Sequence, residues 1–588
     1  MKQINRFFVA LTFLVLSINA NAQSVIDSGN CGANGDNLFW RFTSDYTLII
    51  SGIGTMNNYS TVNAPWFSYR LQIKNVIIGD SVTTIGNNSF NYCSNMILLT
   101  IGDSVVTIGK NAFYRCTNLT SLIIPNSVIT IEEYAFGGCE SVTSLTLGNS
   151  VTSIGKRAFG SLRALSTSLI IPNSVITIEE NAFTGSGLTS LTLGNSVSAI
   201  GERAFDCEYL TSIDVDINNL NYSSIEGVLY NKIQTTLIQY PQSKQGVVTI
   251  PNSVTTIGEW AFYRCYYLDS LVIPDSVITI KDYAFYYSSL TSLTLGNSVT
   301  TIGDNAFGSC EGLTSLIIPD FVTTIGEWAF FNCTNLTSLT LGNSVTTIGE
   351  RAFSNCWSLK SIIIPNSVII IGVDAFSGCG DADSLTIGNS VTTIKQGAFS
   401  NCWSLKSVKI PNSVITLERN AFIHCERLKS LTIGSSVALI GGSAFLNCDI
   451  DSIISYAINP PETYPTAFGD VYINTPISVP CVSENVYKNS YVWDRFTNYI
   501  GCETENLSEV IQENNIKIYP NPVQNELRIK NEECRINTVE ILDIAGRIVG
   551  AYCIRPNATI NVSSLPQGIY LVKIYTDKGV LTQKVVKK

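Results

Sequence analysis

Phenylalanine recurs along most of the chain at a nearly constant interval. Eleven of the fifteen intervals are 23 residues, and alanine precedes every phenylalanine except the first. A coil of this length cannot enclose its own apolar side chains, so the period predicts coils that stack and share one core. The column consists of Phe90, Phe113, Phe136, Phe159, Phe183, Phe205, Phe262, Phe285, Phe307, Phe330, Phe353, Phe376, Phe399, Phe422, Phe445 and Phe468.

Each coil also contains a short segment in which apolar and polar residues alternate. In one such segment we expect Leu336, Leu339 and Leu341 to point into the core. Ser338 and Thr340 then point outward, as the two-residue period of a strand requires. The pattern predicts a mainly β solenoid of about sixteen 23-residue coils, with a continuous parallel sheet along one side.

Two irregularities modify this simple repeat. The residue after the strand alternates between glycine and proline, as in Gly342 and Pro365, which makes a pair of coils the structural unit. The interval from Phe205 to Phe262 is 57 residues, and its additional segment lies at about 216–248. Two runs of alternating residues there predict a β-hairpin that projects from the solenoid.

The exposed ends of a stack of coils need caps. We expect the repeats to occupy residues 75–470. Residues 23–74 contain Trp40 and Trp66 and predict a small β cap before the first coil. Residues 471–502 are rich in aromatic side chains and predict a second cap after the last coil.

The first residues have the features of a secretory signal. Two basic residues precede an apolar run, and the small residues that follow predict a signal peptide over residues 1–22, cleaved between Ala22 and Gln23. The run is too short to cross a bilayer, so we expect no transmembrane segment in the mature form.

The last part of the chain has a different pattern. Residues 503–514 are polar and predict a linker. Between residue 515 and residue 588, six short alternating runs are separated by turn residues, which predicts a small antiparallel β-sandwich.

Composition and charge exclude several functions. The net charge of −10 has the wrong sign for binding phosphate backbones, so nucleic acid is not an expected partner. His424 is the only histidine in 588 residues, which removes most catalytic triads and imidazole metal sites. The sequence therefore predicts a protein that is not an enzyme and needs no cofactor or metal.

Cysteine follows the same period as phenylalanine. Eleven cysteines lie three residues after a phenylalanine of the column and Cys207 lies two after it, so we interpret all twelve as buried thiols rather than as a disulfide or metal ladder. Cys481 and Cys502 flank the second cap and can form a disulfide in an exported protein. The sequence leaves the state of Cys31, Cys534 and Cys553 open.

A column of acidic residues raises the question of calcium. It lies three residues before the phenylalanines, but it lacks the clustered Asp and Gly of calcium loops. We interpret it instead as carboxylates that favour the start of a short helical turn. Its members are Glu133, Glu180, Glu202, Glu259, Asp282, Asp304, Glu327 and Glu350.

The outward residues of the strands form the most distinctive predicted surface. Serine stands at the same position in nearly every coil, and the outward position beyond it alternates between threonine and an apolar residue. Such a flat face either tolerates small hydroxyl residues or docks an extended partner. The apolar alternation disfavours ice binding. The predicted binding face comprises Ser292, Thr294, Ser315, Ser338, Thr340, Ser361, Ser384 and Thr386.

Two resemblances add to this interpretation. The pattern L-x-x-L-x-L with a later A-F-x-x-C, over residues 75–470, resembles the BspA-like leucine-rich repeat. Tyr519-Pro520-Asn521-Pro522, Gly546-Arg547 and the run from Leu565 to Tyr570 resemble the C-terminal sorting domain of the type IX (Por) secretion system. The second resemblance implies passage across a bacterial outer membrane by that secretion machinery, followed by surface attachment or release.

These resemblances imply a secreted or cell-surface protein whose partner is a protein or another cell-surface ligand. The first hypothesis is an adhesin for host matrix proteins or other bacteria. The alternative is a structural component of a surface layer, whose repeats associate with one another.

Overall fold

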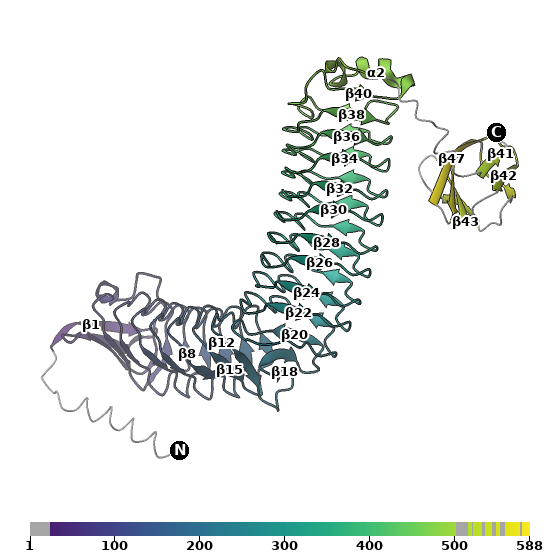
Figure 1. The fold of residues 1–588 in the computed structure, drawn as a ribbon. Coiled ribbons are helices and arrows are strands. Elements are labelled where there is room, and N and C mark those ends of the chain that lie inside the picture. Colours follow the sequence, from purple (N-terminus) through teal and green to yellow (C-terminus); the bar gives the residue numbers. More distant parts are fainter. Residues whose placement is uncertain are drawn as a thin grey trace. The chain divides into compact units, whose positions relative to one another are not determined.

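The computed structural model describes two compact units. The first comprises the chain up to Ile477 together with Lys488–Asn498, and the second comprises Ser478–Tyr487 and the chain from Tyr499 onward. Figure 1 shows the stack of coils of the first unit and, from β41 onward, the small β domain of the second. The described residues are 24–500, 516–519, 521–531, 536–543, 548–552, 559–576 and 579–588. No helix within these ranges is long and apolar enough to cross a membrane.

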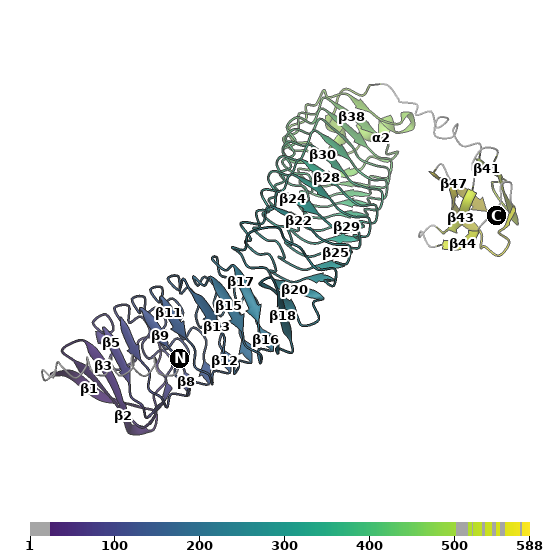
Figure 2. The same ribbon diagram turned by 60° about the horizontal axis from the view of Figure 1, so that its bottom comes forward.

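Each coil of the solenoid contains two short strands joined by turns. The first, which we call the serine strand, begins at a serine in most coils. The second, which we call the threonine strand, usually consists of Thr-Ile. Both kinds pair in parallel with their neighbours, for example Ser338 with Ser315 and Thr347 with Thr324. Figure 2 shows the two kinds on different sides of the stack, with β24 and β28 on one and β25 and β29 on the other.

The strand bounds follow the sequence period. The serine strands and their equivalents are β5 (Asn75–Ile78), β7 (Leu98–Thr100), β9 (Ser121–Ile123), β11 (Ser144–Thr146), β13 (Ser168–Ile170), β15 (Ser190–Leu193), β17 (Ser212–Val215), β22 (Ser270–Val272), β24 (Ser292–Thr294), β26 (Ser315–Ile317), β28 (Ser338–Thr340), β30 (Ser361–Ile363), β32 (Ser384–Thr386), β34 (Ser407–Lys409), β36 (Ser430–Ile433), β38 (Ser452–Ser455) and β40 (Ile477–Ser478). The threonine strands and their equivalents are β4 (Gly54–Thr55), β6 (Val82–Ile85), β8 (Thr107–Ile108), β10 (Thr130–Ile131), β12 (Ser153–Ile154), β14 (Thr177–Ile178), β16 (Ala199–Ile200), β21 (Thr256–Ile257), β23 (Thr279–Ile280), β25 (Thr301–Ile302), β27 (Thr324–Ile325), β29 (Thr347–Ile348), β31 (Ile370–Ile371), β33 (Thr393–Ile394), β35 (Thr416–Leu417), β37 (Leu439–Ile440) and β39 (Glu462–Thr463).

The position of the continuous sheet corrects the sequence-based expectation. The threonine strands form the long sheets, one of seven strands from β4 to β16 and one of 13 strands ending at β39. The serine strands, which we expected to be continuous, form mostly two-stranded ladders such as β26–β28 and β30–β32. Each ladder joins a proline coil to the glycine coil that follows, and proline ends its strand without an N–H to donate. The solenoid is thus a stack of coil pairs on the serine side.

Close approach of the backbone explains why proline and glycine alternate. A Cβ at Gly342 would lie 2.3 Å from the carbonyl oxygen of Pro319, and one at Gly388 would lie 2.3 Å from that of Pro365. Only glycine permits this approach. Within the same pair, the N–H of Ile364 donates to the carbonyl of Thr386 at 2.8 Å. The 46-residue unit is therefore set by packing between two coils.

The phenylalanine column forms the centre of the core, as the sequence predicts. Phe330 and Phe353 are both fully buried, and their ring centroids lie 5.2 Å apart with nearly parallel planes. The column continues beyond the phenylalanines at one end, where Trp66 stacks on Phe90 at 5.3 Å. At the other end, Trp493 packs edge-on against Phe468 at 5.4 Å and closes the stack.

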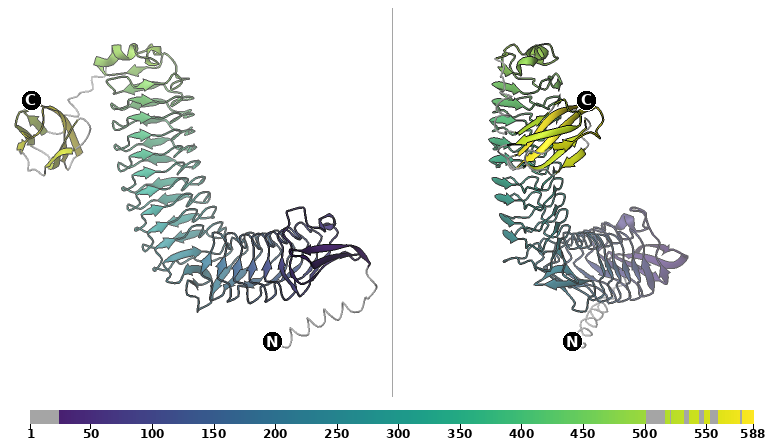
Figure 3. Two further views of the ribbon diagram at one scale, coloured as in Figure 1. Left: turned by 180° about the vertical axis from the view of Figure 1, so that it is seen from behind. Right: turned by 90° about the vertical axis from the view of Figure 1, so that its right-hand side faces the viewer.

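The insertion between Phe205 and Phe262 belongs to the body of the solenoid. It forms β18 (Tyr222–Ile225), β19 (Val228–Asn231) and β20 (Thr236–Gln239), an antiparallel meander. The predicted hairpin exists as β19–β20, but its projection from the solenoid is wrong, because β20 pairs in parallel with β21 and begins the 13-stranded sheet. Tyr230 and Leu237 are buried there. Figure 3 shows the stack changing direction at this point.

A small β cap precedes the first coil. Its strands are β1 (Val25–Gly32), β2 (Gly35–Thr43) and β3 (Thr47–Gly52), followed by the short 3-10 helix η1 (Phe67–Tyr69). β1, β2 and β3 are antiparallel, whereas β3 pairs in parallel with β5 and so joins the cap to the solenoid. Beyond the last coil lie η2 (Cys481–Ser483), α2 (Glu484–Lys488) and η3 (Trp493–Arg495).

The C-terminal domain contains two antiparallel sheets, in agreement with the predicted sandwich. One has the order β41-β42-β45 and the other the order β44-β43-β46-β47. Val539, Val572 and Ile574 are among the residues of its own apolar core. The strands are β41 (Ile516–Tyr519), β42 (Glu526–Asn531), β43 (Ile536–Leu542), β44 (Ile548–Tyr552), β45 (Thr559–Asn561), β46 (Gly568–Thr576) and β47 (Gly579–Lys587).

Candidate binding face

The predicted binding face lies on the serine strands of five consecutive coils. Its eight residues belong to β24, β26, β28, β30 and β32. Seven of them are exposed, and Ser361 is half-buried. The strand residue between the two outward side chains is buried in β26 and β30, as Leu316 and Ile362, whereas Leu339 of β28 and Leu385 of β32 are half-buried. The strand period thus places one row of hydroxyl groups along the solenoid.

Large apolar side chains are exposed beside these hydroxyl groups. In every second coil the threonine is replaced by an apolar residue, and Val272, Ile317 and Ile363 are 65%, 68% and 59% exposed. A single exposed isoleucine is ordinary, but a regular row of apolar side chains along successive coils is typical of a contact surface. The row ends at Lys409, which occupies the equivalent position in β34.

A shallow groove runs along the ends of the same strands. It has a volume of about 820 Å³ and crosses coils from β28 to β34. Thr340 and Thr386 of the predicted face line it together with Ile363 and Pro365. Asn366 and Asn389 add amide groups, and the Oδ1 of Asn366 accepts the backbone N–H of Asn389 at 2.8 Å. The groove therefore offers apolar contacts and hydrogen-bonding groups together.

The repeat cysteines are buried thiols, as predicted. All twelve are free and buried, and most donate to a phenylalanine carbonyl of the preceding coil, for example Cys356 to Phe330 at 3.3 Å. Burial raises the pKa of Cys93, Cys207 and Cys402 to about 12. A thiol that holds its proton this strongly is a poor nucleophile and metal ligand.

The other cysteines have different outcomes. Cys31 is a free thiol buried in the first cap. Cys502, Cys534 and Cys553 lie outside the described residues, so the pairing of Cys481 with Cys502 stays a prediction. Ala22 and Gln23, at the predicted cleavage point, also lie outside them.

The acidic column contacts the backbone and lysines of the solenoid. The Oδ1 of Asp282 accepts the backbone N–H of Asp304 at 2.8 Å, and Glu133 pairs with Lys110 at 2.6 Å. Turns rather than helices surround these carboxylates, so backbone hydrogen bonds replace the expected helix dipole. Within the described ranges, no group of three or more acidic, cysteine or histidine side chains could hold a metal ion. His424 lies in a turn, with Nδ1 2.9 Å from the amide nitrogen of Asn447.

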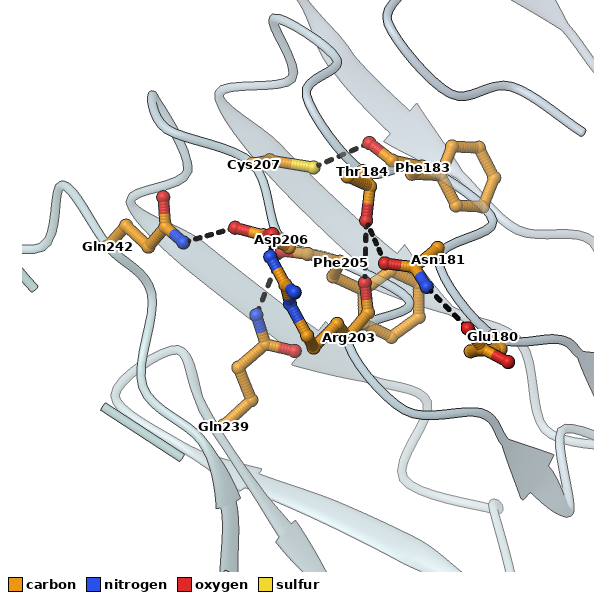
Figure 4. A network of polar contacts seen from close by, with 10 residues as sticks. All are labelled: Glu180, Asn181, Phe183, Thr184, Arg203, Phe205, Asp206, Cys207, Gln239 and Gln242. Carbon is orange, nitrogen blue, oxygen red and sulfur yellow. Dashed lines mark hydrogen bonds and ion pairs between the residues drawn. The ribbon is translucent and has the colours of Figure 1, made fainter. Parts of the chain in front are cut away.

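One polar network was missed by the sequence analysis. Arg203 forms an ion pair with buried Asp206, and the Nε2 of Gln242 donates to the other carboxylate oxygen of Asp206 at 2.6 Å (Figure 4). The guanidinium also lies over the rings of Trp260 and Tyr263, at 4.8 and 4.5 Å from their centroids. These groups line a cavity of about 280 Å³ where the insertion interrupts the repeat. In the sequence, the 57-residue interval between Phe205 and Phe262 was the feature that could have indicated this network.

The fold and the exposed face define a repeat solenoid followed by a separate β domain. The model for the BspA type leucine rich repeat region matches in six copies over residues 60–168, 129–247, 232–360 and 346–469. The model for the secretion system C-terminal sorting domain matches residues 517–588. The chain therefore belongs to the BspA-type leucine-rich repeat family.

Several solved structures are similar to this chain. A leucine-rich repeat protein from Eubacterium ventriosum is 28% identical, with a TM-score of 0.48, over 68% of this chain and 94% of its own. A leucine rich cell surface protein from Faecalibacterium prausnitzii is 33% identical, with a TM-score of 0.46, over 57% of this chain and 94% of its own. A leucine-rich repeat protein from Bacteroides ovatus is 23% identical, with a TM-score of 0.46, over 79% and 98%. No curated protein matches the chain significantly.

The two family models together indicate the cellular location of the protein. The sorting domain implies handling by the type IX secretion system, and the BspA-type repeats are those of a cell-surface protein that interacts with other proteins. The chain is thus a secreted or cell-surface leucine-rich repeat protein.

Proposed function

We propose that the protein is a non-catalytic adhesin that binds host matrix proteins or other bacteria through its serine strands. The observation that carries this proposal is the regular row of exposed apolar residues, represented by Ile317 and Ile363, beside a row of hydroxyl groups. Apolar contacts supply affinity, and the hydroxyl and amide groups supply orientation. Both carboxylate oxygens of Asp206 are occupied, one by the guanidinium of Arg203 and the other by the amide of Gln242, which supports a structural role for this carboxylate rather than catalysis.

The proposal includes the domain boundaries drawn from the sequence. The signal peptide, residues 1–22, is removed at Ala22. The caps occupy 23–74 and 471–502 around the repeats at 75–470, and a linker at 503–514 leads to the sorting domain at 515–588. Binding needs no cofactor, and neither nucleic acid nor a transmembrane segment takes part.

The test places positive charge on the proposed face. Lysine at Ser315, Ser338 and Ser361 puts three long charged side chains beside the apolar row, where desolvating them opposes docking. The matched control places lysine at Thr301, Thr324 and Thr347, which lie on the threonine strands of three consecutive coils in the same region. Binding of the full mature chain to immobilised matrix proteins and to whole bacteria is measured by surface plasmon resonance and by pull-down.

We expect the serine-strand variant to lose binding at least tenfold, while the control keeps it. Equal binding by both variants would remove the serine strands from the proposal. The alternative is a surface-layer component that associates with itself. It predicts that the wild-type chain is an oligomer in light scattering and that the serine-strand variant is a monomer.

A further inference from the structure

Two exposed tryptophans stand at a position that most coils fill with a small or acidic residue, and Tyr266 places a third exposed ring at the same position of another coil. Trp357 and Trp403 directly follow a repeat cysteine and are 53% and 44% exposed. The neighbouring coils place threonine or a carboxylate at this position, as in Thr334 and Glu426. A single exposed aromatic side chain is ordinary, but these two tryptophans occupy equivalent positions, and neither ring fills the core. Packing within the coil therefore does not explain the two side chains, which indicates a contact with another molecule.

The two indoles occupy equivalent positions, two coils apart. The core rings of the three coils concerned are separated by 5.2 Å from Phe353 to Phe376 and by 5.6 Å from Phe376 to Phe399. Each tryptophan lies four residues after the phenylalanine of its own coil. The solenoid thus presents two aromatic rings that are two coils apart along its axis.

The intermediate coil leaves room for the second ring. Gly380 stands at the tryptophan position of this coil, and a Cβ there would lie 2.7 Å from the Cε3 atom of Trp403. The six-membered ring is therefore held against the backbone of the preceding coil. Such support reduces the rotamer entropy that the side chain loses when a ligand binds.

The charged residues around the tryptophans compensate one another. Lys360 pairs with Asp381 at 2.6 Å, and Lys406 pairs with Asp383 at 2.8 Å. These side chains are at least half exposed, so they remain available to water or to a ligand as donors and acceptors. A strip in which positive and negative charges balance attracts neither a polyanion nor a polycation. It suits a neutral ligand that is rich in hydroxyl groups.

We propose that this strip, defined by Trp357, Gly380 and Trp403 with the two ion pairs, binds an extended neutral β-1,4-linked glycan along the solenoid axis. The step between neighbouring sugars in such a chain is close to the step between neighbouring coils. Alternate sugars of an extended β-1,4 chain present the same face in the same direction. Rings at every second coil therefore meet equivalent C–H faces and stack on them, while the paired charges bond to hydroxyl groups between them.

This site lies outside the row of serine-strand residues and does not rest on protein docking there. The glycan can belong to a host surface or to another bacterium, since the chemistry is the same.

The experiment uses the full mature chain and three hexasaccharides. Chitohexaose and cellohexaose have β-1,4 links, whereas maltohexaose has α-1,4 links and curves away from the axis. Binding is measured by calorimetry and by quenching of tryptophan fluorescence, to which the strip contributes two of the seven tryptophans. We expect at least one β-1,4 hexamer to bind and maltohexaose not to bind.

Variants separate stacking from a general surface effect. Trp357→Ala and Trp403→Ala should each lower the affinity about tenfold, which corresponds to one stacked ring. Tyr267→Ala, which removes an exposed ring in another coil, should change nothing. Asp449→Trp adds a ring two coils beyond Trp403 and should tighten binding, whereas Glu426→Trp, one coil beyond, should not.

Several results would overturn the proposal. They are failure of both β-1,4 hexamers to bind, equal binding of maltohexaose, and unchanged affinity in the Trp357→Ala, Trp403→Ala double variant. Circular dichroism and the unfolding midpoint verify that each variant is folded, because exposed side chains should contribute little to stability.

Discussion

Replacing one glycine of the coil pairs by alanine tests why the repeat unit is 46 residues. The Cβ of Gly388→Ala would lie 2.3 Å from the carbonyl oxygen of Pro365 and 2.6 Å from its carbonyl carbon. Both atoms belong to the backbone of the neighbouring coil, so no flexible side chain can move aside. The two coils must separate by several tenths of an ångström, and overpacking of this kind costs about 2–3 kcal/mol.

The loss should appear locally, because each coil contacts only its neighbours. Hydrogen exchange read by mass spectrometry measures the free energy of local opening along the chain. Protected amides on both sides of the altered contact, such as Ile364, whose N–H donates to Thr386, should exchange about 30-fold to 150-fold faster. Coils far from residue 388 should exchange as before.

Gly442→Ala is the matched control. A Cβ at residue 442 meets only the Oγ1 of Thr466, at 3.3 Å, and the Cβ of Tyr464, at 3.8 Å. The same chemical change there should be neutral or slightly stabilising, since alanine restricts the unfolded chain. If Gly388→Ala exchanges at the rates of Gly442→Ala, close approach between coils is not the cause of the glycine–proline alternation.

Three further predictions concern the core and the insertion. Tyr240→Ala should lower the unfolding midpoint by the equivalent of about 3–5 kcal/mol, while Tyr240→Phe, which keeps the ring, should cost under about 1 kcal/mol. Asp206→Ala leaves Arg203 without its ion pair and should lower the free energy of unfolding by about 3 kcal/mol. Asp381→Ala removes a partner from an exposed pair and should lower it by less than about 0.5 kcal/mol. Denaturant titration measures both values. Burial raises the pKa of Cys402 from 9.0 to about 12, so the folded chain holds this proton more tightly than the unfolded chain. The free energy of unfolding should not depend on this thiol below pH 9, and it should fall by about 1.4 kcal/mol per pH unit for each such thiol between pH 9 and 12. Cys402→Ala should show a shallower fall over the same range. A free energy of unfolding that stays constant from pH 9 to 12 would contradict this prediction.

Sequence periodicity was sufficient for the features that each coil repeats alone. The phenylalanine column, the buried cysteines and the outward serines depend on which side of a coil a residue faces, and this is encoded within 23 residues. The alternating runs of the C-terminal domain gave its strands for the same reason. What the pattern did not contain was the contact between coils.

Three misjudged features arise from contacts between coils. The position of the continuous sheet depends on which N–H and carbonyl groups of adjacent coils meet, and Pro365 carries no N–H for that purpose. The insertion was expected to project because its sequence resembles an isolated hairpin, yet Leu237 pairs with Ile257 and extends the sheet. Tyr240 escaped notice because it is not phenylalanine, although it lies 22 residues before Phe262 and stacks on it at 5.0 Å.

All coils of this chain pack in the same way, so a residue that differs from its equivalents in the other coils is informative. Tyr240 departs from the phenylalanine column, and its stacking on Phe262 explains the departure entirely within the core. Lys409 and Trp403 depart on exposed positions, and neither side chain enters the core. Their place in the fold therefore separates them from the structural substitutions. Lys409 ends the apolar row of the binding face, and Trp403 extends the solenoid's aromatic surface into solvent, so each marks a boundary or a contact that packing alone does not require.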